Sequence, residues 1–249
     1  MIPKIIHYIW LGKEDKPEIF HKCFDSWKKF CPDWEFKLWD ESNVDLDCCL
    51  YVREAYDAKK YAFASDVIRL QKLYEYGGVY LDIDVELLRP IDSFLCEKCV
   101  AGFEINANIA PGLFLGTEKG NIDFKHIIDQ YKKEHFVLGR KYNLRTIGDR
   151  FTKYYEKQGL RKQDVLQKLD SITVYPMEYF CPMNYKTGAI SVTSNSYALH
   201  YYEGSWLKKR SIKDKFKLFI KRCIRALTGK KFFQKIEDRR KKKIDFTIK

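Results

Sequence analysis

Two aspartates separated by one residue, Asp82 and Asp84, are the residues of this chain whose types and spacing most directly suggest chemistry. They lie in residues 77–85, where two glycines are followed by alternating apolar and acidic residues. This alternation predicts a buried strand, on which side chains two positions apart point to the same face. Adjacent carboxylates repel each other, and Mg²⁺ or Mn²⁺ relieves this by binding their oxygens, often together with substrate phosphates. The spacing alone fits either a metal site or a strand end with two solvated aspartates.

Three more side chains lie on elements that would flank this strand. Asp66 and Arg69 are spaced i, i+3 on a helix predicted over residues 61–76, so they share a helix face. Such a pair is either a surface ion pair or a carboxylate and a guanidinium presented to a sugar or a phosphate. Trp10 ends the first predicted strand, residues 5–10, and is either a core aromatic or a platform for a nucleobase.

The elements that must position these residues alternate between short apolar runs and amphipathic stretches. Strands are predicted at 5–10, 34–39 and 197–202, and helices after Pro17 and over 61–76, the second ending at a Gly77-Gly78 left-handed cap. Residues 101–155 have a mixed pattern. Alternation of this kind is typical of a layered α/β domain.

Composition places the chain among folded globular proteins. It has 249 residues, of which 45% are hydrophobic and 16% aromatic, enough for a sizeable core in one α/β domain or two small ones. No stretch reaches the ~20 apolar residues that span a bilayer, and the N-terminus does not resemble a signal peptide, so we expect a cytoplasmic protein. Eight scattered cysteines are expected to be reduced, and the Cys96/Cys99 spacing lacks a matching second pair for a metal.

The net charge of +12 is concentrated at one end of the chain. Residues 208–249 hold 18 basic and 4 acidic residues, whereas residues 1–207 hold 28 basic and 30 acidic ones. The C-terminal segment also shows apolar residues at helical spacing from Phe216 to Leu227. We therefore expect a domain at 1–207 and a basic amphipathic helical tail at 208–249. This tail either anchors the protein to an anionic membrane surface or packs on the domain.

Three motifs, in order, carry a resemblance to a known family. They are residues 2–12 (Ile-Pro-Lys-Ile-Ile-His-Tyr-Ile-Trp-Leu-Gly), 64–69 (Ala-Ser-Asp-Val-Ile-Arg) and 76–84 (Tyr-Gly-Gly-Val-Tyr-Leu-Asp-Ile-Asp). Together they resemble glycosyltransferase family 32, which includes capsule and lipopolysaccharide sugar transferases and is related to the glucosyltransferase domains of clostridial toxins. The resemblance covers the first 90 residues strongly, with a weaker echo at 197–200 and 204–206.

The resemblance implies a GT-A fold, a Rossmann-like domain that binds a nucleotide sugar, and a role for each matching residue. Trp10 would stack on the base, and Asp66 and Arg69 would hold the donor sugar. Asp82 would contact the ribose or the donor sugar and reach the metal through water. Asp84 would bind Mn²⁺ or Mg²⁺ directly.

Other residues receive roles from the same resemblance. His200 is a candidate further metal ligand, with a purely structural histidine as its alternative. Ser205 and Trp206 would close a loop over the diphosphate. A weaker expectation places part of the acceptor site at Glu104, Asn106 and Asn108.

The expected activity is a metal-dependent sugar transfer that retains the anomeric configuration. The donor would be UDP- or GDP-linked, and the acceptor a glycan or lipid-linked oligosaccharide in surface polysaccharide synthesis. We expect the enzyme at the inner face of the membrane, with no nucleic-acid partner.

Two alternatives remain open from the residues. The run 81–85 also fits the opening motif of haloacid-dehalogenase-like phosphatases, with Asp82 as nucleophile and Asp84 as general acid. However, the later acidic motif is incomplete, because Lys153 stands four residues after Asp149. A nucleic-acid-binding protein would use the basic tail, but it would also need a basic folded body, and residues 1–207 are slightly acidic.

Overall fold

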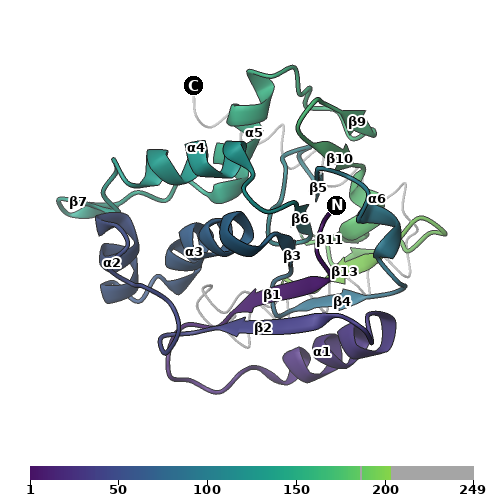
Figure 1. Ribbon diagram of the computed structural model, residues 1–249, viewed down its shortest axis with the longest axis horizontal. Coiled ribbons are helices and arrows are strands. Elements are labelled where there is room, and N and C mark those ends of the chain that lie inside the picture. The colour runs from purple at the N-terminus through teal and green to yellow at the C-terminus, as the bar shows by residue number, and fades with distance from the viewer. Residues whose placement is uncertain (186, 203–249) are drawn as a thin grey trace, which may run out of the picture. The chain divides into compact units, whose positions relative to one another are not determined.

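A seven-stranded sheet forms the centre of the computed structural model, which describes residues 1–185 and 187–202 (Figure 1). Its strands lie in the order β2-β1-β3-β6-β5-β10-β9. Five of them are parallel to one another, and only β6 and β9 run the opposite way. Their bounds are β1 Ile5–Ile9, β2 Glu35–Trp39, β3 Gly78–Tyr80, β5 Cys99–Gly102, β6 Leu115–Thr117, β9 Gln167–Lys168 and β10 Thr173–Tyr175. The expected α/β class is confirmed.

Helices cover both faces of this sheet, as Figure 1 shows. Their bounds are α1 Glu18–Phe30, α2 Leu50–Asp57, α3 Tyr61–Tyr76, α4 Ile122–Tyr131, α5 Ile147–Glu156 and α6 Met177–Phe180. Alternate strand residues enter two apolar clusters: Cys99 and Ala101 pack with α2 to α5, whereas Val100 packs with α1 and α6. The alternation follows from the period of two along a strand.

The predicted helix over 61–76 is confirmed to the residue as α3, and its end shows why two glycines follow it. The Gly77 N–H donates to the Leu73 carbonyl at 2.8 Å, and both Gly77 and Gly78 have positive φ angles, 68° and 102°. A side chain at Gly78 would also clash, because an added Cβ would lie 2.7 Å from the Ile5 carbonyl oxygen. The chain can therefore reverse and enter the sheet only with glycines here.

The predicted acidic strand is wrong in one respect. β3 ends at Tyr80, and Asp82 to Asp84 form a turn closed by a 3.0 Å hydrogen bond from the Val85 N–H to the Asp82 carbonyl. The chain resumes as β4, Val85–Leu87, which leaves the main sheet and pairs antiparallel with β13, Ala198–His200. Alternation of residue types cannot show where a chain leaves one sheet and pairs with another strand. Here the chain leaves the main sheet after β3 to pair with β13, and the turn at Asp82 to Asp84 lies at that point.

The remaining described elements are short: η1 Asp92–Phe94, β7 Val137–Leu138, β8 Lys141–Tyr142, β11 Met183–Asn184 and β12 Ala189–Ile190. Residues 1–183 and 190–202 belong to one compact unit, which holds the sheet and the site. Among the described residues, no helix combines the length and apolar character needed to cross a membrane. The expected tail at 208–249 lies outside the described residues.

Candidate metal and donor site

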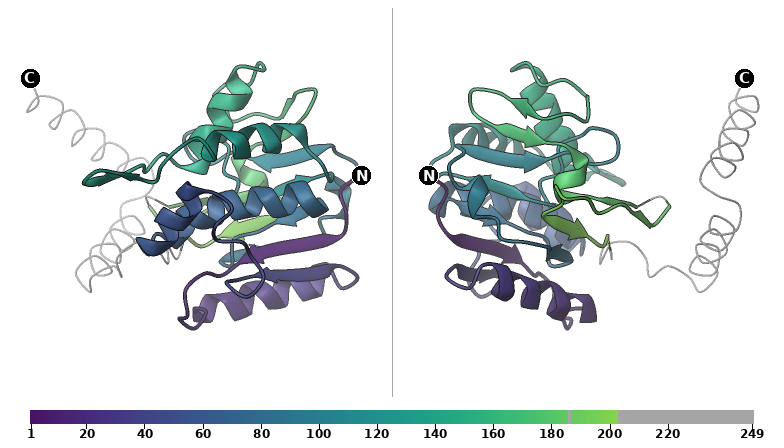
Figure 2. Two further views of the ribbon diagram at one scale, coloured as in Figure 1. Left: turned by 60° about the vertical axis from the view of Figure 1, so that its left-hand side comes forward. Right: turned by 90° about the vertical axis from the view of Figure 1, so that its right-hand side faces the viewer.

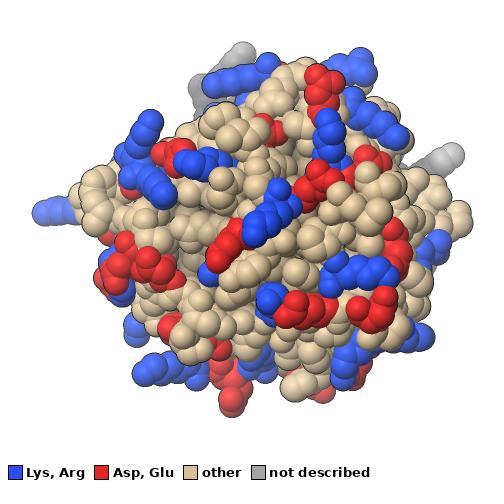
Figure 3. Space-filling view, viewed as in Figure 1, with Lys and Arg blue, Asp and Glu red and all other residues tan. Residues whose placement is uncertain are grey.

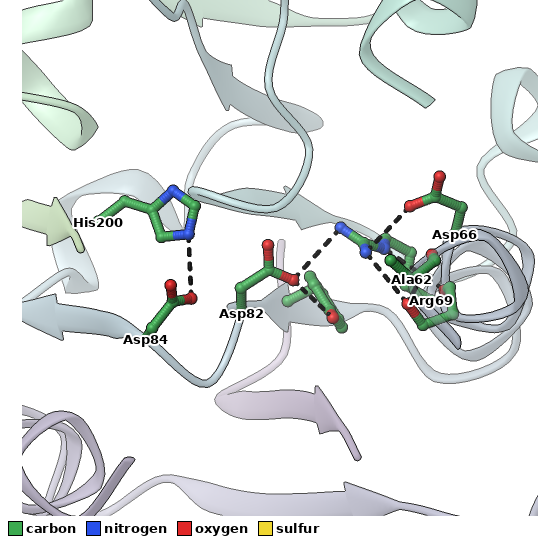
Figure 4. A network of polar contacts seen from close by, with 8 residues as sticks. Ala62, Asp66, Arg69, Asp82, Asp84 and His200 are labelled. Carbon is green, nitrogen blue, oxygen red and sulfur yellow. Dashed lines mark hydrogen bonds and ion pairs between the residues drawn. The ribbon is translucent and has the colours of Figure 1, made fainter. Parts of the chain in front are cut away.

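Three of the predicted metal ligands come together at the turn between β3 and β4 (Figure 4). One potential ligand atom from each of Asp82, Asp84 and His200 lies within 4.8 Å of the other two. The pairing of β13 with β4 sets His200 opposite Val85 and thus beside the turn, although it is distant in the sequence. The His200 Nε2 lies 3.0 Å from an Asp84 carboxylate oxygen, and both side chains are buried.

This donor set fits a divalent cation on chemical grounds. Two carboxylates and one imidazole suit Mn²⁺, while carboxylates with water and phosphate oxygens suit Mg²⁺. Asp82 is the partly exposed member, with 30% of its side chain accessible, so a cation here would be open to a ligand on that side. The structure therefore brings together the residues that the sequence proposed for the metal.

The electrostatics of His200 reflect its acidic neighbours. Burial is the largest single influence and would lower its pKa. The charge and hydrogen bond of Asp84, together with the charges of Asp82 and Glu104, act in the opposite direction and prevail. The pKa of His200 is consequently raised above its usual value. A positive charge at this position is favoured, which is the condition under which a cation also binds.

Asp82 is linked to α3 through Arg69. An Arg69 guanidinium nitrogen lies 3.5 Å from the Asp82 carboxylate, and another lies 3.0 Å from that of Asp66. Tyr80 completes the arrangement, because its hydroxyl donates to Asp82 at 2.9 Å and Arg69 stacks 4.4 Å above its ring. The i, i+3 pair is confirmed, but it is a buried bridge between the helix and the acidic turn, and not a surface ion pair.

Burial dominates the ionisation of Asp66. It raises the pKa of this carboxyl to about 7, and the Asp82 charge acts in the same direction, while Arg69 opposes both. A buried arginine between two carboxyl groups stays protonated, and its own pKa is raised further. Arg69 thus supplies a fixed positive charge directly beside the predicted donor site.

Gly112 forms the wall against which Asp82 rests. Its carbonyl accepts a 2.9 Å hydrogen bond from the Asp82 N–H. A Cβ added to Gly112 would lie 2.1 Å from a carboxylate oxygen of Asp82 and 3.2 Å from Arg69. No side chain fits here without displacing the aspartate.

Trp10 lies just beyond the end of β1 and is partly buried. Its indole N–H donates to the Glu14 carbonyl at 2.8 Å, and its ring packs at the margin of the apolar cluster around α1. The next glycine, Gly12, has a φ of 93° and sits against the Tyr61 ring, which begins α3. Trp10 therefore lies at the carboxyl edge of the sheet, where the acidic turn also lies, and its contact with a base stays a prediction.

The three residues expected at the acceptor, Glu104, Asn106 and Asn108, fall in the connection from β5 to β6. Glu104 is near enough to His200 to raise its pKa, and Gly112 of the same connection contacts Asp82. This segment thus borders the site, and its role in binding the acceptor stays a prediction. Ser205 and Trp206, predicted to cover the diphosphate, lie outside the described residues.

Two residues of the site, Tyr80 and Gly112, were missed by the sequence analysis. Tyr80 stands two positions before Asp82, and this spacing was available as a signal. Gly112 had no such signal, because nothing in the sequence places residue 112 beside residue 82.

Comparison with known proteins agrees with this site. Residues 17–101 match the family described as "Glycosyltransferase sugar-binding region containing DXD motif", and the resemblance seen in the sequence is thereby confirmed. The matched range includes Asp66, Arg69, Asp82 and Asp84. It does not include Trp10 or the segment that carries His200.

Individual relatives match over a little more than a third of the chain. The chain is 40% identical over 98 residues to inositol phosphoceramide mannosyltransferase 3 of Schizosaccharomyces pombe, covering 38% of this chain and 27% of the relative. It is 32% identical over 105 residues to an uncharacterized glycosyltransferase of Acanthamoeba polyphaga mimivirus, covering 38% and 40%. The chain therefore spans well under half the length of these relatives.

Among solved structures, the chain can be aligned with that of the PaToxG glycosyltransferase. It aligns with a TM-score of 0.49 at 21% identity, over 63% of this chain and 68% of that one.

Proposed function

We propose that this protein transfers a sugar from a nucleotide-sugar donor to an acceptor hydroxyl in a metal-dependent reaction. The premise is that residues 17–101 match a glycosyltransferase sugar-binding region that contains a D-x-D motif. The single observation that carries the proposal is the convergence of Asp82, Asp84 and His200 within 4.8 Å, beside the fixed charge of Arg69. Two carboxylates and an imidazole at one point form a donor set that a divalent cation can bind.

Each residue of the site has a task in this reaction. Asp84 and His200 would hold the divalent ion. Asp82 would accept a hydrogen bond from a hydroxyl of the ribose or the donor sugar and would reach the ion through water. When bound, the ion neutralises the negative charge that develops on the departing nucleoside diphosphate.

Arg69 orients Asp82, and Asp66 keeps Arg69 in place while reaching the donor sugar. Trp10 stacks on the base, and Ser205 and Trp206 close over the diphosphate. The resemblance to glycosyltransferase family 32 supports a transfer that retains the anomeric configuration. We propose a front-side route, in which the bond from the anomeric carbon to the phosphate breaks as the acceptor oxygen attacks and the leaving phosphate takes the proton of the acceptor.

The wider setting is also proposed. The acceptor is a glycan or a lipid-linked oligosaccharide of surface polysaccharide synthesis, and Glu104, Asn106 and Asn108 border its site. We assign residues 1–207 to the catalytic domain and 208–249 to a basic tail that holds the enzyme at the inner, anionic face of a membrane. The charge difference between the two segments supports this division.

The direct test is a screen of nucleotide sugars for Mn²⁺-dependent hydrolysis and transfer. Three relatives are named mannosyltransferases, so GDP-mannose is tested first, followed by UDP-linked sugars. The proposal is supported if the wild type turns over one donor and if this turnover falls at least a hundredfold in Asp84→Asn. Asp33→Asn is the matched control, because Asp33 is an exposed aspartate paired with Lys4 at 2.6 Å. Undiminished turnover in Asp84→Asn would contradict the proposal.

A further inference from the structure

We propose that the hairpin of β7 and β8 is a lipid-docking element, which inserts its apolar side chains into the surface of an anionic bilayer. The inference rests on this surface alone and does not depend on the proposed sugar transfer. It also concerns a segment separate from the basic tail.

The hairpin exposes an unusual concentration of apolar side chains. Val137, Leu138 and Tyr142 are 39%, 55% and 45% exposed, and Leu144, directly after β8, is 59% exposed. Single exposed apolar residues are common and need no explanation, but these four lie within eight positions. Val137 and Tyr142 are paired across the hairpin, and Leu138 lies on its other face. Figure 2 shows that this hairpin projects from the body of the protein.

A rigid base holds the hairpin in this position. Phe136, directly before β7, is fully buried, with its ring 5.4 Å from that of Tyr51 and 5.2 Å from that of Phe63. The Tyr142 ring stacks on the Phe136 ring, with their centres 5.1 Å apart. The exposed side chains are therefore presented by a fixed support, so little conformational entropy is lost when they bind.

The charges around the hairpin select an anionic lipid surface as its partner. The basic residues of 132–145 are Lys132, Lys133, Arg140, Lys141 and Arg145. In Figure 3, Lys and Arg side chains lie at the end of the molecule where Figure 1 places β7. Basic groups around a small apolar tip are the arrangement that binds anionic headgroups while the tip enters the acyl boundary.

The nearby carboxylates offset only part of this charge, because five basic residues lie in 132–145 and Glu134 is already paired with Arg150. Glu134 accepts two hydrogen bonds from the buried Arg150, at 2.9 Å and 2.6 Å. Glu54 accepts the backbone N–H groups of Phe136 and Val137 and lies 2.7 Å from the His135 ring. Asp57, which helps line a hollow of about 570 Å³ between α2 and the hairpin, lies 3.7 Å from Arg53.

The hairpin rises from the edge of the sheet that carries the acidic turn. α3 precedes β3 and runs back along it, so the first turn of α3 lies at the carboxyl end of β3. Phe63 belongs to that turn and contacts the hairpin base. A bilayer bound by the hairpin would consequently lie on the same side of the protein as Asp82.

The test measures insertion directly in the full chain. Leu138→Trp is mixed with vesicles of phosphatidylcholine and phosphatidylserine that carry brominated acyl chains. We expect its fluorescence to be quenched beyond that of the five native tryptophans. Quenching reports contact with lipid, which neither anchoring by the tail nor docking of another protein would produce at this position.

Partitioning provides the second measurement. We expect Val137→Ser/Leu138→Ser to lower partitioning into these vesicles roughly tenfold, since two apolar side chains no longer leave water. Val165→Ser/Leu166→Ser, which changes two apolar residues that are 47% and 49% exposed, is the control and should change it less than about twofold. Absence of extra quenching, unchanged partitioning of the hairpin variant, or an equal loss in the control would overturn the proposal.

Discussion

Asp82 illustrates at the residue scale how the site is held. Its N–H is bound by Gly112, its carboxylate by Tyr80 and Arg69, and Arg69 in turn by Asp66. A carboxylate fixed by groups of this kind is oriented before any ligand arrives, which reduces the cost of ordering it on binding. Displacing this carboxylate by a larger residue at position 112 should therefore reduce ligand affinity more than it reduces the stability of the fold.

Gly112→Ala tests this directly. Its Cβ would lie 2.1 Å from the Asp82 carboxylate, so we expect the aspartate to be displaced and nucleotide-sugar turnover to fall roughly tenfold or more. The measurement is kcat/KM together with the midpoint of thermal unfolding. Gly120→Ala is the control, because its Cβ would meet nothing within 4 Å and only its positive φ of 78° is strained. Equal turnover in wild type and Gly112→Ala would contradict the tight contact.

His7 shows a second residue-scale effect, this time on stability. The Trp39 indole N–H donates to its Nδ1 at 3.0 Å, so Nε2 carries the proton and donates to the Gly77 carbonyl at 2.7 Å. Burial lowers the pKa of His7 to about 4, although its bond to Gly77 acts in the opposite direction. The unfolded chain therefore binds more protons than the folded protein between about pH 6.5 and pH 4.

Stability should consequently fall as the pH falls through this window. We expect His7 to account for about 2 to 3 kcal/mol of lost unfolding free energy between pH 7.5 and pH 4.5. Urea unfolding gives the unfolding free energy of the wild type and of His7→Gln at both pH values. The change between the two pH values is then compared in the two proteins, so that the opposite contribution of Asp66, which is present in both, cancels. Parallel pH profiles for the two proteins would show that His7 is not held neutral.

At the scale of elements, the sequence predicted those whose pattern is local. The helix over 61–76, the helix after Pro17 and the first two strands are confirmed, because periodicity and Gly or Pro boundaries define them within one segment. The turn at Asp82 was missed because β4 pairs with β13, more than a hundred residues later. The mixed pattern of 101–155 contains α4 and α5, whose faces are decided by packing on α3.

The candidate ligands were predictable for a related reason. Asp82, Asp84, Asp66 and Arg69 lie in contiguous motifs, whereas Gly112 reaches the site only through the tertiary fold. His200 came from the family resemblance and not from any spacing.

Arg150 tests how strongly α5 depends on its buried ion pair. Its side chain is fully buried, it forms two hydrogen bonds with Glu134, and its guanidinium lies 4.1 Å from the Tyr131 ring centre. We expect Arg150→Leu to cost about 3 kcal/mol of unfolding free energy, because Glu134 loses its partner.

Denaturant unfolding measures this cost. Arg53→Leu serves as the comparison, since Arg53 pairs with Asp47 at the surface and should cost less than about 1 kcal/mol. Similar losses in the two variants would mean that burial adds nothing to the pair at Arg150.

At the scale of the whole molecule, charge separates the chain into an almost neutral body and a basic C-terminal segment. If that segment binds a membrane as proposed, reversing five charges to glutamate at Arg239, Arg240, Lys241, Lys242 and Lys243 should weaken binding strongly. Each basic group near an anionic surface contributes about 1 kcal/mol, so we expect the loss of five such groups to weaken binding at least a hundredfold. Vesicle sedimentation at two phosphatidylserine contents measures it, and binding that is unchanged at both contents would exclude the tail as an anchor.

The proposed activity requires above all that Asp84, His200 and Asp82 hold a divalent cation beside a nucleoside diphosphate. The most direct measurement is the electron paramagnetic resonance of Mn²⁺ titrated with the protein in the presence of GDP or UDP. We predict a single Mn²⁺ site whose affinity falls more than tenfold in Asp84→Asn and in His200→Gln, but stays unchanged in Asp92→Asn, an exposed aspartate paired with Lys4 at 2.8 Å. Mn²⁺ binding of equal strength in the wild type and in both site variants would contradict the claim.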